Sequence, residues 1–172
     1  MITSKMAKAL NEQLNAELYS SYLYLSMSAY ASFKGLKGAA HWLSLQVQEE
    51  DLHVQKVYDY IDSQGVQIVL EAIEKPPTEF GSLLELFDGV LAHERMVTGR
   101  INDLMTLAVK EADHATETFL QWFVTEQTEE EKTAQEIIDK LKLAGDTGLA
   151  IFMIDNELGA RTAAAPAAPA GA

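Results

Sequence analysis

Two side chains that can bind a metal, Glu50 and His53, lie three positions apart in the sequence. On an α-helix this spacing places the carboxylate and the imidazole on one face. The rest of that face is apolar and is expected to be buried. Its apolar members are Ala39, Leu43, Val47, Val54, Val57 and Ile61. Burying an unpaired carboxylate is unfavourable, so a partner must neutralise Glu50.

Polar side chains interrupt three further apolar helical faces in the same way. They are Glu17, Glu94 and the pair Gln127 and Glu130. The apolar neighbours on these faces are Leu10, Leu14 and Tyr24; Leu83, Phe87, Val90, Ile101 and Met105; and Leu120, Phe123, Ala134, Ile138 and Leu141. Four amphipathic helices therefore each carry at least one acidic or amide side chain on the face that should be buried.

The spacing between these residues is regular. Glu17 and Glu50 are 33 residues apart, as are Glu94 and Gln127, and the two pairs are offset by 77 positions. The midpoint of each pair falls beside a predicted turn, near residues 33–35 and 110–113. Residues equidistant from the turn of a helical hairpin lie at the same level. Each hairpin therefore brings its polar residues to one level, and two hairpins can share one site.

The four carboxylates of Glu17, Glu50, Glu94 and Glu130 carry four negative charges, which two divalent cations would balance. A salt bridge is the ordinary explanation for one buried glutamate, but none of the four faces carries Lys or Arg. Carboxylates with one imidazole and no sulfur suit iron or manganese, with zinc as a competitor. The pattern predicts a two-metal site that can bind O2 at an open position.

A second acidic group lies beside this set. Glu49 and Glu126 are again 77 residues apart, and Glu129 follows one turn later. These residues form either a solvated acidic face or a further ion site. Tyr24 lies two turns after Glu17 and is either an ordinary buried tyrosine or a residue that hydrogen-bonds the site or donates an electron to it. The other histidines show no comparable pattern and are expected to be structural or exposed: His41, His93 and His114.

The elements that position these residues are four long helices of an all-α bundle. We expect them over residues 5–33, from the turn at 34–38 to about 64, over 82–110, and from a cap at 113 to about 143. The predicted end signals are Thr3 or Ser4, Gly65, the capping box Ser82 to Glu85, Asp113 and Gly145. Residues 66–81 contain Pro76-Pro77 and no helical period, so they predict a long crossover along the bundle.

A short fifth helix is expected from about Thr147 to Leu158, with Asp146 as its N-cap. It is apolar around most of its circumference and follows a finished bundle, so it packs either on its own bundle or between subunits. Residues 161–172 are rich in alanine and proline and are expected to form a flexible tail after a single domain of residues 1–160.

Composition excludes several classes of function. The 172 residues include no cysteine, which excludes disulfides, thiolate chemistry and iron–sulfur clusters. No apolar run is long enough for a membrane span, and the first residues lack the apolar core of a signal peptide. The net charge of −13 argues against nucleic acid as a partner and is compatible with attracting cations. A cytoplasmic protein is expected.

These motifs resemble those of prokaryotic non-haem ferritins over roughly residues 5–158. The resemblance rests on Leu23-Tyr24-Leu25-Ser26-Met27, on Glu49-Glu50-x-x-His53 and on Glu126-Gln127-x-Glu129-Glu130. In ferritin-like di-iron proteins, two helices each give one Glu and two each give Glu-x-x-His. The first half of this chain follows that pattern, and the second half has Gln127-x-x-Glu130 instead.

The resemblance implies a role for each residue of the two acidic groups. One iron site would use Glu17, Glu50 and His53, with Glu50 bridging to a second site of Glu50, Glu94, Gln127 and Glu130. A third iron site would use Glu49, Glu126 and Glu129, and Tyr24 would lie beside the centre. Such proteins form homo-oligomeric cages of about 24 subunits, which oxidise Fe(II) with O2 or peroxide and store a ferric mineral. The resemblance also places the fifth helix at four-fold axes, and Asp113, His114 and Glu117 at three-fold channels.

Departures from sister families narrow this expectation. Leu52 replaces the haem-ligating methionine of bacterioferritins, so no haem is expected, and a rubrerythrin would need cysteines that the chain lacks. The miniature ferritins place their ligands at a dimer interface and lack this four-helix set. Two alternatives stay open: a di-iron oxidoreductase that acts on an organic substrate without storing iron, and a helical scaffold whose inward acids are structural.

Overall fold

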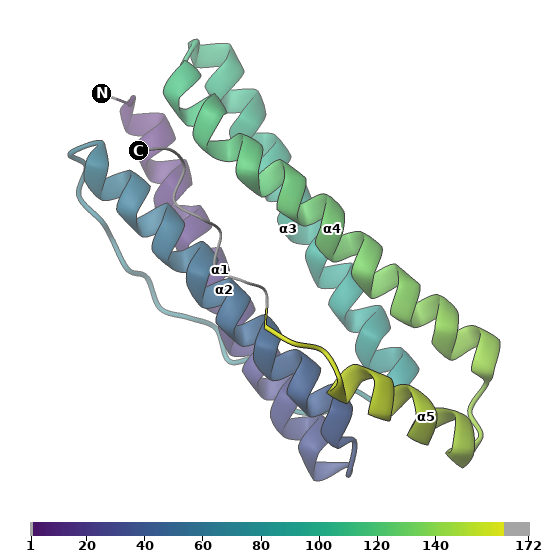
Figure 1. Cartoon of the computed structure of the whole chain (residues 1–172). Coiled ribbons are helices and arrows are strands. Elements are labelled where there is room, and N and C mark those ends of the chain that lie inside the picture. The colour runs from purple at the N-terminus through teal and green to yellow at the C-terminus, as the bar shows by residue number, and fades with distance from the viewer. Residues whose placement is uncertain (1, 164–172) are drawn as a thin grey trace.

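The chain folds into five α-helices, in a computed structural model that describes residues 2–163 (Figure 1). Within that range there is no β-strand. The helices are α1 (Ser4–Phe33), α2 (Lys37–Ser63), α3 (Leu83–Glu111), α4 (His114–Ala144) and α5 (Gly148–Gly159). The prediction of an all-α, ferritin-like four-helix bundle with a short fifth helix is confirmed.

The bundle consists of two helical hairpins. Helix α1 packs mainly against α2, and α3 packs mainly against α4. The segment between α2 and α3 has no regular structure and runs back along the length of the bundle (Figure 1). This is the predicted long crossover, and it makes α3 start at the end of the bundle opposite to the end of α2.

The helix ends follow the capping signals in the sequence with one exception. Thr3, Ser82 and Asp113 each accept a hydrogen bond from a backbone N–H of the first turn, and Ser82 forms the full capping box with Glu85. The prediction that Asp146 caps α5 is wrong. The helix begins at Gly148, so Thr147 occupies the cap position and accepts from the Ala150 N–H at 3.3 Å.

Two apolar clusters fill the bundle, and a polar layer separates them. One cluster lies toward the end of the bundle that α5 covers, and its largest members include Tyr24, Trp42 and Phe87. The other lies toward the opposite end and includes Met6, Ile61 and Phe123. The buried polar side chains between them are Gln13, Glu17, Ser20, Gln46, Glu50, His53, His93, Glu94 and Gln127.

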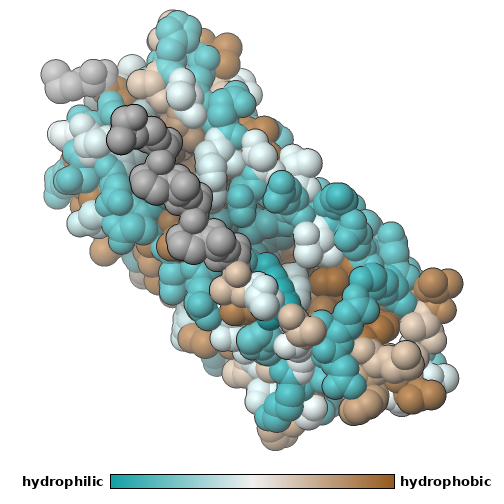
Figure 2. All heavy atoms as spheres, viewed as in Figure 1, coloured by the Kyte–Doolittle hydropathy of each residue, from teal (hydrophilic) through white to brown (hydrophobic). Residues whose placement is uncertain are grey.

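Helix α5 packs on its own bundle with one face and exposes the other. Ile154 and Leu158 are buried against α2 and α4. Leu149, Phe152 and Met153 are 71%, 63% and 63% exposed. Hydrophobic atoms gather at the corner of the molecule where α5 lies (Figure 2). Packing on its own bundle is thus observed, and burial of the exposed side between subunits stays a prediction.

Two further predictions concern membrane spans and the C-terminal tail. No helix of the part that the structure describes is at once long and apolar enough to cross a bilayer. Of the predicted tail at 161–172, residues 164–172 lie outside the described residues, and the domain boundary at 160 stays a prediction. Arg161, by contrast, has defined contacts with α2.

Candidate metal centre

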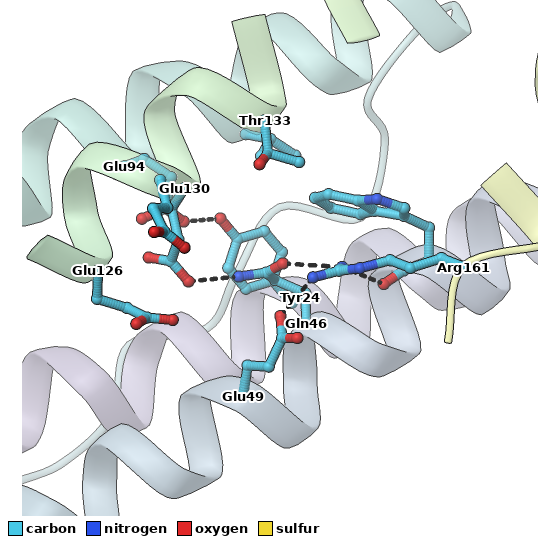
Figure 3. Close-up of a pocket in the computed structure, with 11 residues that line it drawn as sticks. Tyr24, Gln46, Glu49, Glu94, Glu126, Glu130, Thr133 and Arg161 are labelled. Carbon is cyan, nitrogen blue, oxygen red and sulfur yellow. Dashed lines mark hydrogen bonds and ion pairs between the residues drawn. The ribbon is translucent and has the colours of Figure 1, made fainter. Parts of the chain in front are cut away.

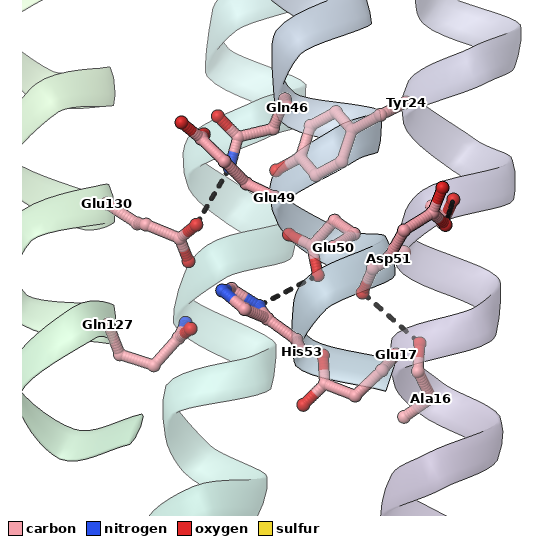
Figure 4. Close-up of polar contacts among 12 residues, drawn as sticks. Ala16, Glu17, Tyr24, Gln46, Glu49, Glu50, Asp51, His53, Gln127 and Glu130 are labelled. Carbon is pink, nitrogen blue, oxygen red and sulfur yellow. Dashed lines mark hydrogen bonds and ion pairs between the residues drawn. The ribbon is translucent and has the colours of Figure 1, made fainter. Parts of the chain in front are cut away.

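Each of the four long helices contributes to the polar layer (Figure 4). Helix α1 supplies Glu17 and α2 supplies Glu50 and His53. Helix α3 supplies Glu94, and all four side chains are buried. Helix α4 adds Gln127, which is buried, and Glu130, which is partly buried. The regular spacing of these residues in sequence thus brings all six to one level, because both hairpins turn midway between their paired residues.

The ligand atoms form two groups that share Glu50. In the first group, oxygens of Glu17 and Glu50 and a ring nitrogen of His53 lie within 4.8 Å of one another. In the second, one oxygen each of Glu50, Glu94 and Glu130 does the same. A shared carboxylate between two groups of this size suits two adjacent divalent cations bridged by Glu50.

Amide and hydroxyl groups orient part of this set. Gln127 donates to the Glu94 carboxylate at 3.1 Å and to the Glu94 backbone oxygen at 3.2 Å. The Tyr24 hydroxyl also donates to Glu94. His53 Nδ1 lies 3.2 Å from Glu50 Oε2, and the imidazole packs edge-on against Phe123. Gln127 therefore donates a hydrogen bond to the Glu94 carboxylate, and its own Oε1 accepts none from the described residues.

Several of these oxygens are buried without a donor. Glu17 Oε2, Glu50 Oε2, Glu130 Oε2 and Gln127 Oε1 have no hydrogen-bond partner among the described residues. Within the same part of the chain, no Lys or Arg forms an ion pair with Glu17, Glu50, Glu94 or Glu130. Unpaired buried acceptors are rare in proteins. Cations fit this set of oxygens, since they would satisfy acceptors that receive no hydrogen bond from the described residues.

Burial and mutual repulsion shift the titration of the carboxyl groups. Burial raises the pKa of Glu50 well above its usual range, and the nearby Glu94 and Glu17 raise it further. The pKa of Glu130 is raised well above its usual range, first by burial and then by Glu94 and Glu50. Burial also raises the pKa of Glu17, although His53 and Gln13 oppose the shift. The chain alone thus disfavours the negative charge that its ligand set needs.

Tyr24 shows the same effect at the edge of the centre. Burial raises its pKa well above the usual value, and the neighbouring carboxylates of Glu94, Glu50 and Glu130 add to the shift. The phenol is therefore neutral at physiological pH and acts as a hydrogen-bond donor. The sequence left open whether Tyr24 is an ordinary buried tyrosine or a residue that contacts the site. The structure shows that it hydrogen-bonds the site through Glu94.

The outer acidic group is only partly assembled (Figure 3). One carboxylate oxygen of Glu126 lies within 4.8 Å of a ring nitrogen of His53 and of a carboxylate oxygen of Glu130, close enough for the three to share a metal ion. Glu49 instead accepts a hydrogen bond from Arg161 at 2.6 Å, and Glu129 is exposed. All three nevertheless line one cavity of about 160 Å³, which also reaches Tyr24, Glu94 and Glu130.

Sequence reasoning missed four residues next to the centre. Gln13 and Gln46 are buried and hydrogen-bond the carboxylates of Glu17 and Glu130. Arg100 and Arg161 in turn donate to these two amides. The available signal was the position of both glutamines, each four residues before a predicted ligand and 33 residues apart. The arginines carried no local signal.

The remaining histidines lie apart from the ligand groups, as expected. His93 is buried, lies 2.8 Å from the Ser20 hydroxyl through Nε2, and has a pKa that burial lowers. His41 and His114 are exposed, and His114 lies 3.3 Å from Glu117. Asp113 caps α4, so all three predicted channel residues lie at the start of that helix.

Comparison with known proteins decides the family. The model of the ferritin-like domain family matches residues 7–144. The chain belongs to the ferritin family. It is 48% identical over 161 residues to a bacterial non-heme ferritin of Bacteroides fragilis (strain 638R), covering 94% of this chain and 100% of the relative. It is 45% identical over 158 residues to a bacterial non-heme ferritin of Escherichia coli O6:H1, covering 92% and 96%.

Solved ferritin structures share the fold. An open pore ferritin from the archaeon Archaeoglobus fulgidus superposes with a TM-score of 0.92 at 46% identity, covering 94% of this chain and 100% of that one. Membership of the ferritin family makes iron storage the function of this chain and iron its bound metal. As a ferritin, it forms a homo-oligomer. The absence of haem, expected from Leu52, stays a prediction.

Proposed function

We propose that this ferritin is a ferroxidase that oxidises two Fe(II) ions at the centre between α1, α2, α3 and α4. The observation that carries the proposal is the pair of ligand groups joined by Glu50, together with buried oxygens that receive no hydrogen bond from the described residues. Burial and then mutual repulsion raise the pKa values of Glu50 and Glu130, and two ions would balance the four carboxylates and remove that repulsion.

Each side chain has a distinct role in this proposal. Glu17 and His53 hold one Fe(II), Glu94 and Glu130 hold the other, and Glu50 bridges the two. Gln127 binds the second ion through Oε1, which has no other partner among the described residues, while its NH2 group holds the Glu94 carboxylate in place. Tyr24 fixes the other side of Glu94, and its neutral phenol is also the nearest candidate for an electron donor. Helices rather than loops hold all these side chains, which keeps the geometry of the ligands fixed between turnovers.

The oxidant accepts the electrons that the pair releases. Two Fe(II) ions give up one electron each, which matches the two-electron reduction of O2 to peroxide or of peroxide to water. The proposal assigns no preference between O2 and peroxide. Both oxidants are small enough for the 160 Å³ cavity that borders the second ion's ligands Glu94 and Glu130.

We propose that a third iron ion binds in the outer acidic group of Glu49, Glu126 and Glu129 before it reaches the pair. Glu126 already faces the centre, whereas Glu49 is held by Arg161. Burial raises the pKa of Glu126, and Glu129 and Glu49 raise it further, while His53 opposes the shift. A cation among these carboxylates would relieve this repulsion.

Storage follows if the oxidised iron leaves the pair for an enclosed interior. We propose a closed cage of about 24 subunits in the cytoplasm, built by rotational symmetry as closed homo-oligomers are. The exposed apolar side of α5 supplies surface for such contacts. The channel role of Asp113, His114 and Glu117 belongs to the same proposal.

The two alternative functions fit the structure less well. An oxidoreductase acting on an organic molecule needs a largely apolar pocket of about 300 Å³ or more beside the metals. The cavity beside this centre is smaller and is lined by Glu49, Glu94, Glu126, Glu129 and Glu130. A structural scaffold would pair its inward acids, but Glu17 and Glu130 each keep a buried oxygen that has no hydrogen bond or ion pair among the described residues.

Iron loading tests the proposal. The metal-free assembly is titrated anaerobically with Fe(II), then exposed to O2, and the soluble iron per chain is counted. A ferroxidase that stores iron binds and rapidly oxidises about two Fe(II) per chain and then takes up far more in soluble form. Oxidation that stops at two ions per chain would indicate an oxidoreductase, and no tight binding of Fe(II) would indicate a scaffold. Glu50→Ala, which removes the bridge, is expected to abolish the rapid phase.

A further inference from the structure

Two buried glutamines connect the metal centre to arginines outside it. Gln13 and Gln46 are only 1% and 3% exposed, although neither belongs to the proposed ligand set. Each lies four residues before a proposed ligand, Glu17 or Glu50, and therefore one helical turn along the same face. A buried amide needs partners for both its oxygen and its nitrogen.

The first amide is Gln13 on α1. Its Nε2 donates to Glu17 Oε1 at 2.8 Å, and its Oε1 accepts from Arg100 Nε at 3.2 Å. Arg100 comes from α3 and also donates to the backbone oxygen of Glu12 at 2.9 Å. These contacts form a continuous relay from an arginine on one helix to a proposed iron ligand on another.

The second amide is Gln46 on α2 (Figure 3). Its Nε2 donates to Glu130 Oε1 at 2.8 Å, and its Oε1 accepts from Arg161 Nη1 at 3.2 Å. Arg161 follows α5, lies over the Trp42 ring at 4.5 Å, and donates to Glu49 at 2.6 Å. The second relay thus ends on the opposite helical hairpin from the first, at a ligand of the other ion.

The arginines determine which way each amide faces. A guanidinium has only donors, so the amide oxygen must point to it and the amide NH2 group must point to the carboxylate. In both relays the NH2 group binds Oε1 of the glutamate. In both glutamates the other oxygen, Oε2, is buried and has no partner among the described residues.

We propose that Arg100 and Arg161 are positioning residues that act through Gln13 and Gln46 to hold Glu17 and Glu130 with Oε2 free for iron. This inference rests on the proposed function of the centre and assigns four residues that are not ligands. Hydrogen-bond partners of metal ligands commonly change metal affinity about 10-fold or more. One relay serves each ion of the pair.

The second relay also joins the centre to the outer acidic group. Arg161 binds Glu49 and Gln46 with the two ends of one guanidinium. Arg161 occupies Glu49 Oε2, so an iron that takes this oxygen as a ligand must displace Arg161 from it. The relay also depends on the placement of α5, because Arg161 is the second residue after that helix ends.

A double-mutant cycle tests the relay on the assembled, metal-free protein, with Co(II) as a redox-stable probe. Gln13→Met is expected to weaken binding in the two tight steps about 10-fold. Arg100→Met should weaken it less, and the double variant should match Gln13→Met alone, because the arginine acts through the amide. Gln46→Met and Arg161→Met should behave in the same way. The comparison uses only the two tight Co(II)-binding steps, because Arg161→Met also releases Glu49 and can change binding at the proposed third site.

The matched control combines one substitution from each relay. Arg100→Met combined with Gln46→Met should show effects that multiply, since these residues share no partner. Multiplying effects within a relay, or unchanged Co(II) affinity in the four single variants, would overturn the proposal. If a Met variant fails to assemble, Arg→Lys and Gln→Asn replace it, because they keep polarity and lose only the geometry.

A second measurement needs no metal. In crystal structures of the metal-free variants, Arg100→Met should change the orientation of Glu17 and leave Glu130 in place, while Arg161→Met should do the reverse. If both carboxylates keep their orientation in both variants, the relays do not position them, whether or not the chain binds iron. If the carboxylates move but the unsubstituted protein binds no Co(II), the relays stand and the proposed function fails.

Discussion

Burial and mutual repulsion act together on the carboxyl groups of Glu50 and Glu130. Both pKa values are raised well above the usual 4.5, first by burial and then by neighbouring acids. As the pH rises from the unfolded to the folded pKa of such a group, the folded chain keeps a proton that the unfolded chain has lost. The free energy of unfolding therefore falls with pH in this interval, and the full penalty remains above it. The acids that would bind iron thus lower the stability of the metal-free protein.

Glu130→Gln tests this penalty, because glutamine keeps the shape and removes one charge. The metal-free variant is expected to be more stable than the unsubstituted protein at pH 7.5, by about 1 kcal/mol per chain. The difference should shrink as the pH falls toward 4.5 and disappear below that pH, where the carboxyl group is protonated in both states. Thermal midpoints at one protein concentration measure it, since assembly makes the midpoint concentration-dependent. A variant that melts lower at pH 7.5 would show that the Glu130 carboxylate stabilises the fold through Gln46.

The outer acidic group gives a prediction about stoichiometry. Changing Glu49, Glu126 and Glu129 together to Ala should lower the number of Co(II) ions bound per chain from about three to about two, with the two tight steps remaining. It should also alter the amount of O2 consumed per Fe(II) in later turnover, because no third iron can wait beside the pair. Loss of a tight step would instead place Glu126 among the ligands of the pair, as its proximity to His53 and Glu130 allows.

At the scale of the helices, α5 is fixed to the start of α2 by backbone contacts. Both oxygens of the Asp155 carboxylate accept backbone N–H groups there, from Gly38 at 3.0 Å and Ala39 at 2.8 Å. They satisfy donors that the helix itself leaves free, and their charge suits the helix N-terminus. The close approach is possible because Gly38 has no side chain. This contact sets the position of Arg161 two residues after α5.

Gly38→Ala should separate α5 from α2. A Cβ at this position would lie 1.6 Å from the backbone oxygen of Asp155 and 2.9 Å from the backbone nitrogen of Gly159. Backbone atoms cannot move aside as side chains do, so we expect a loss of about 1–3 kcal/mol and faster hydrogen exchange over residues 148–159. Gly99→Ala in α3 is the matched control, since its Cβ would meet nothing within 4 Å and should stabilise the helix slightly. Equal midpoints for both variants would contradict the role of Gly38.

The elements and the ligand level were predictable from the sequence because both depend on local periodicity. Helical spacing identifies the buried face of Glu50, and equal distances from two turns bring Glu17 and Glu94 to its level. The direction in which α5 folds back depends on Gly38 and Asp155, which are 117 residues apart and carry no shared pattern. For the same reason Arg161 could not be connected with Gln46 before the fold was known.

At the scale of the whole molecule, the described chain leaves one apolar surface uncovered at the end of the bundle. Leu149, Phe152 and Met153 lie on α5, opposite the buried Ile154 and Leu158. The exposed side chains cluster on a helix that is already docked by its other face (Figure 2). Contiguous exposed apolar surface on a folded protein marks a contact with another molecule. We propose that further copies of the chain cover this surface.

Phe152→Glu tests whether this surface holds the assembly together. A carboxylate placed where copies of α5 meet would be buried without a counter-ion and would repel its symmetry mates, so we expect the cage to dissociate into smaller species. Light scattering after size-exclusion chromatography measures the native mass. Asn102→Glu adds the same charge to an exposed position of α3, away from the apolar side of α5, and should leave the mass unchanged. If Phe152→Glu assembles with the same mass and thermal midpoint as the unsubstituted protein, the exposed side of α5 lies at no interface. An unsubstituted protein with the mass of a monomer or dimer at micromolar concentration would contradict the closed cage itself.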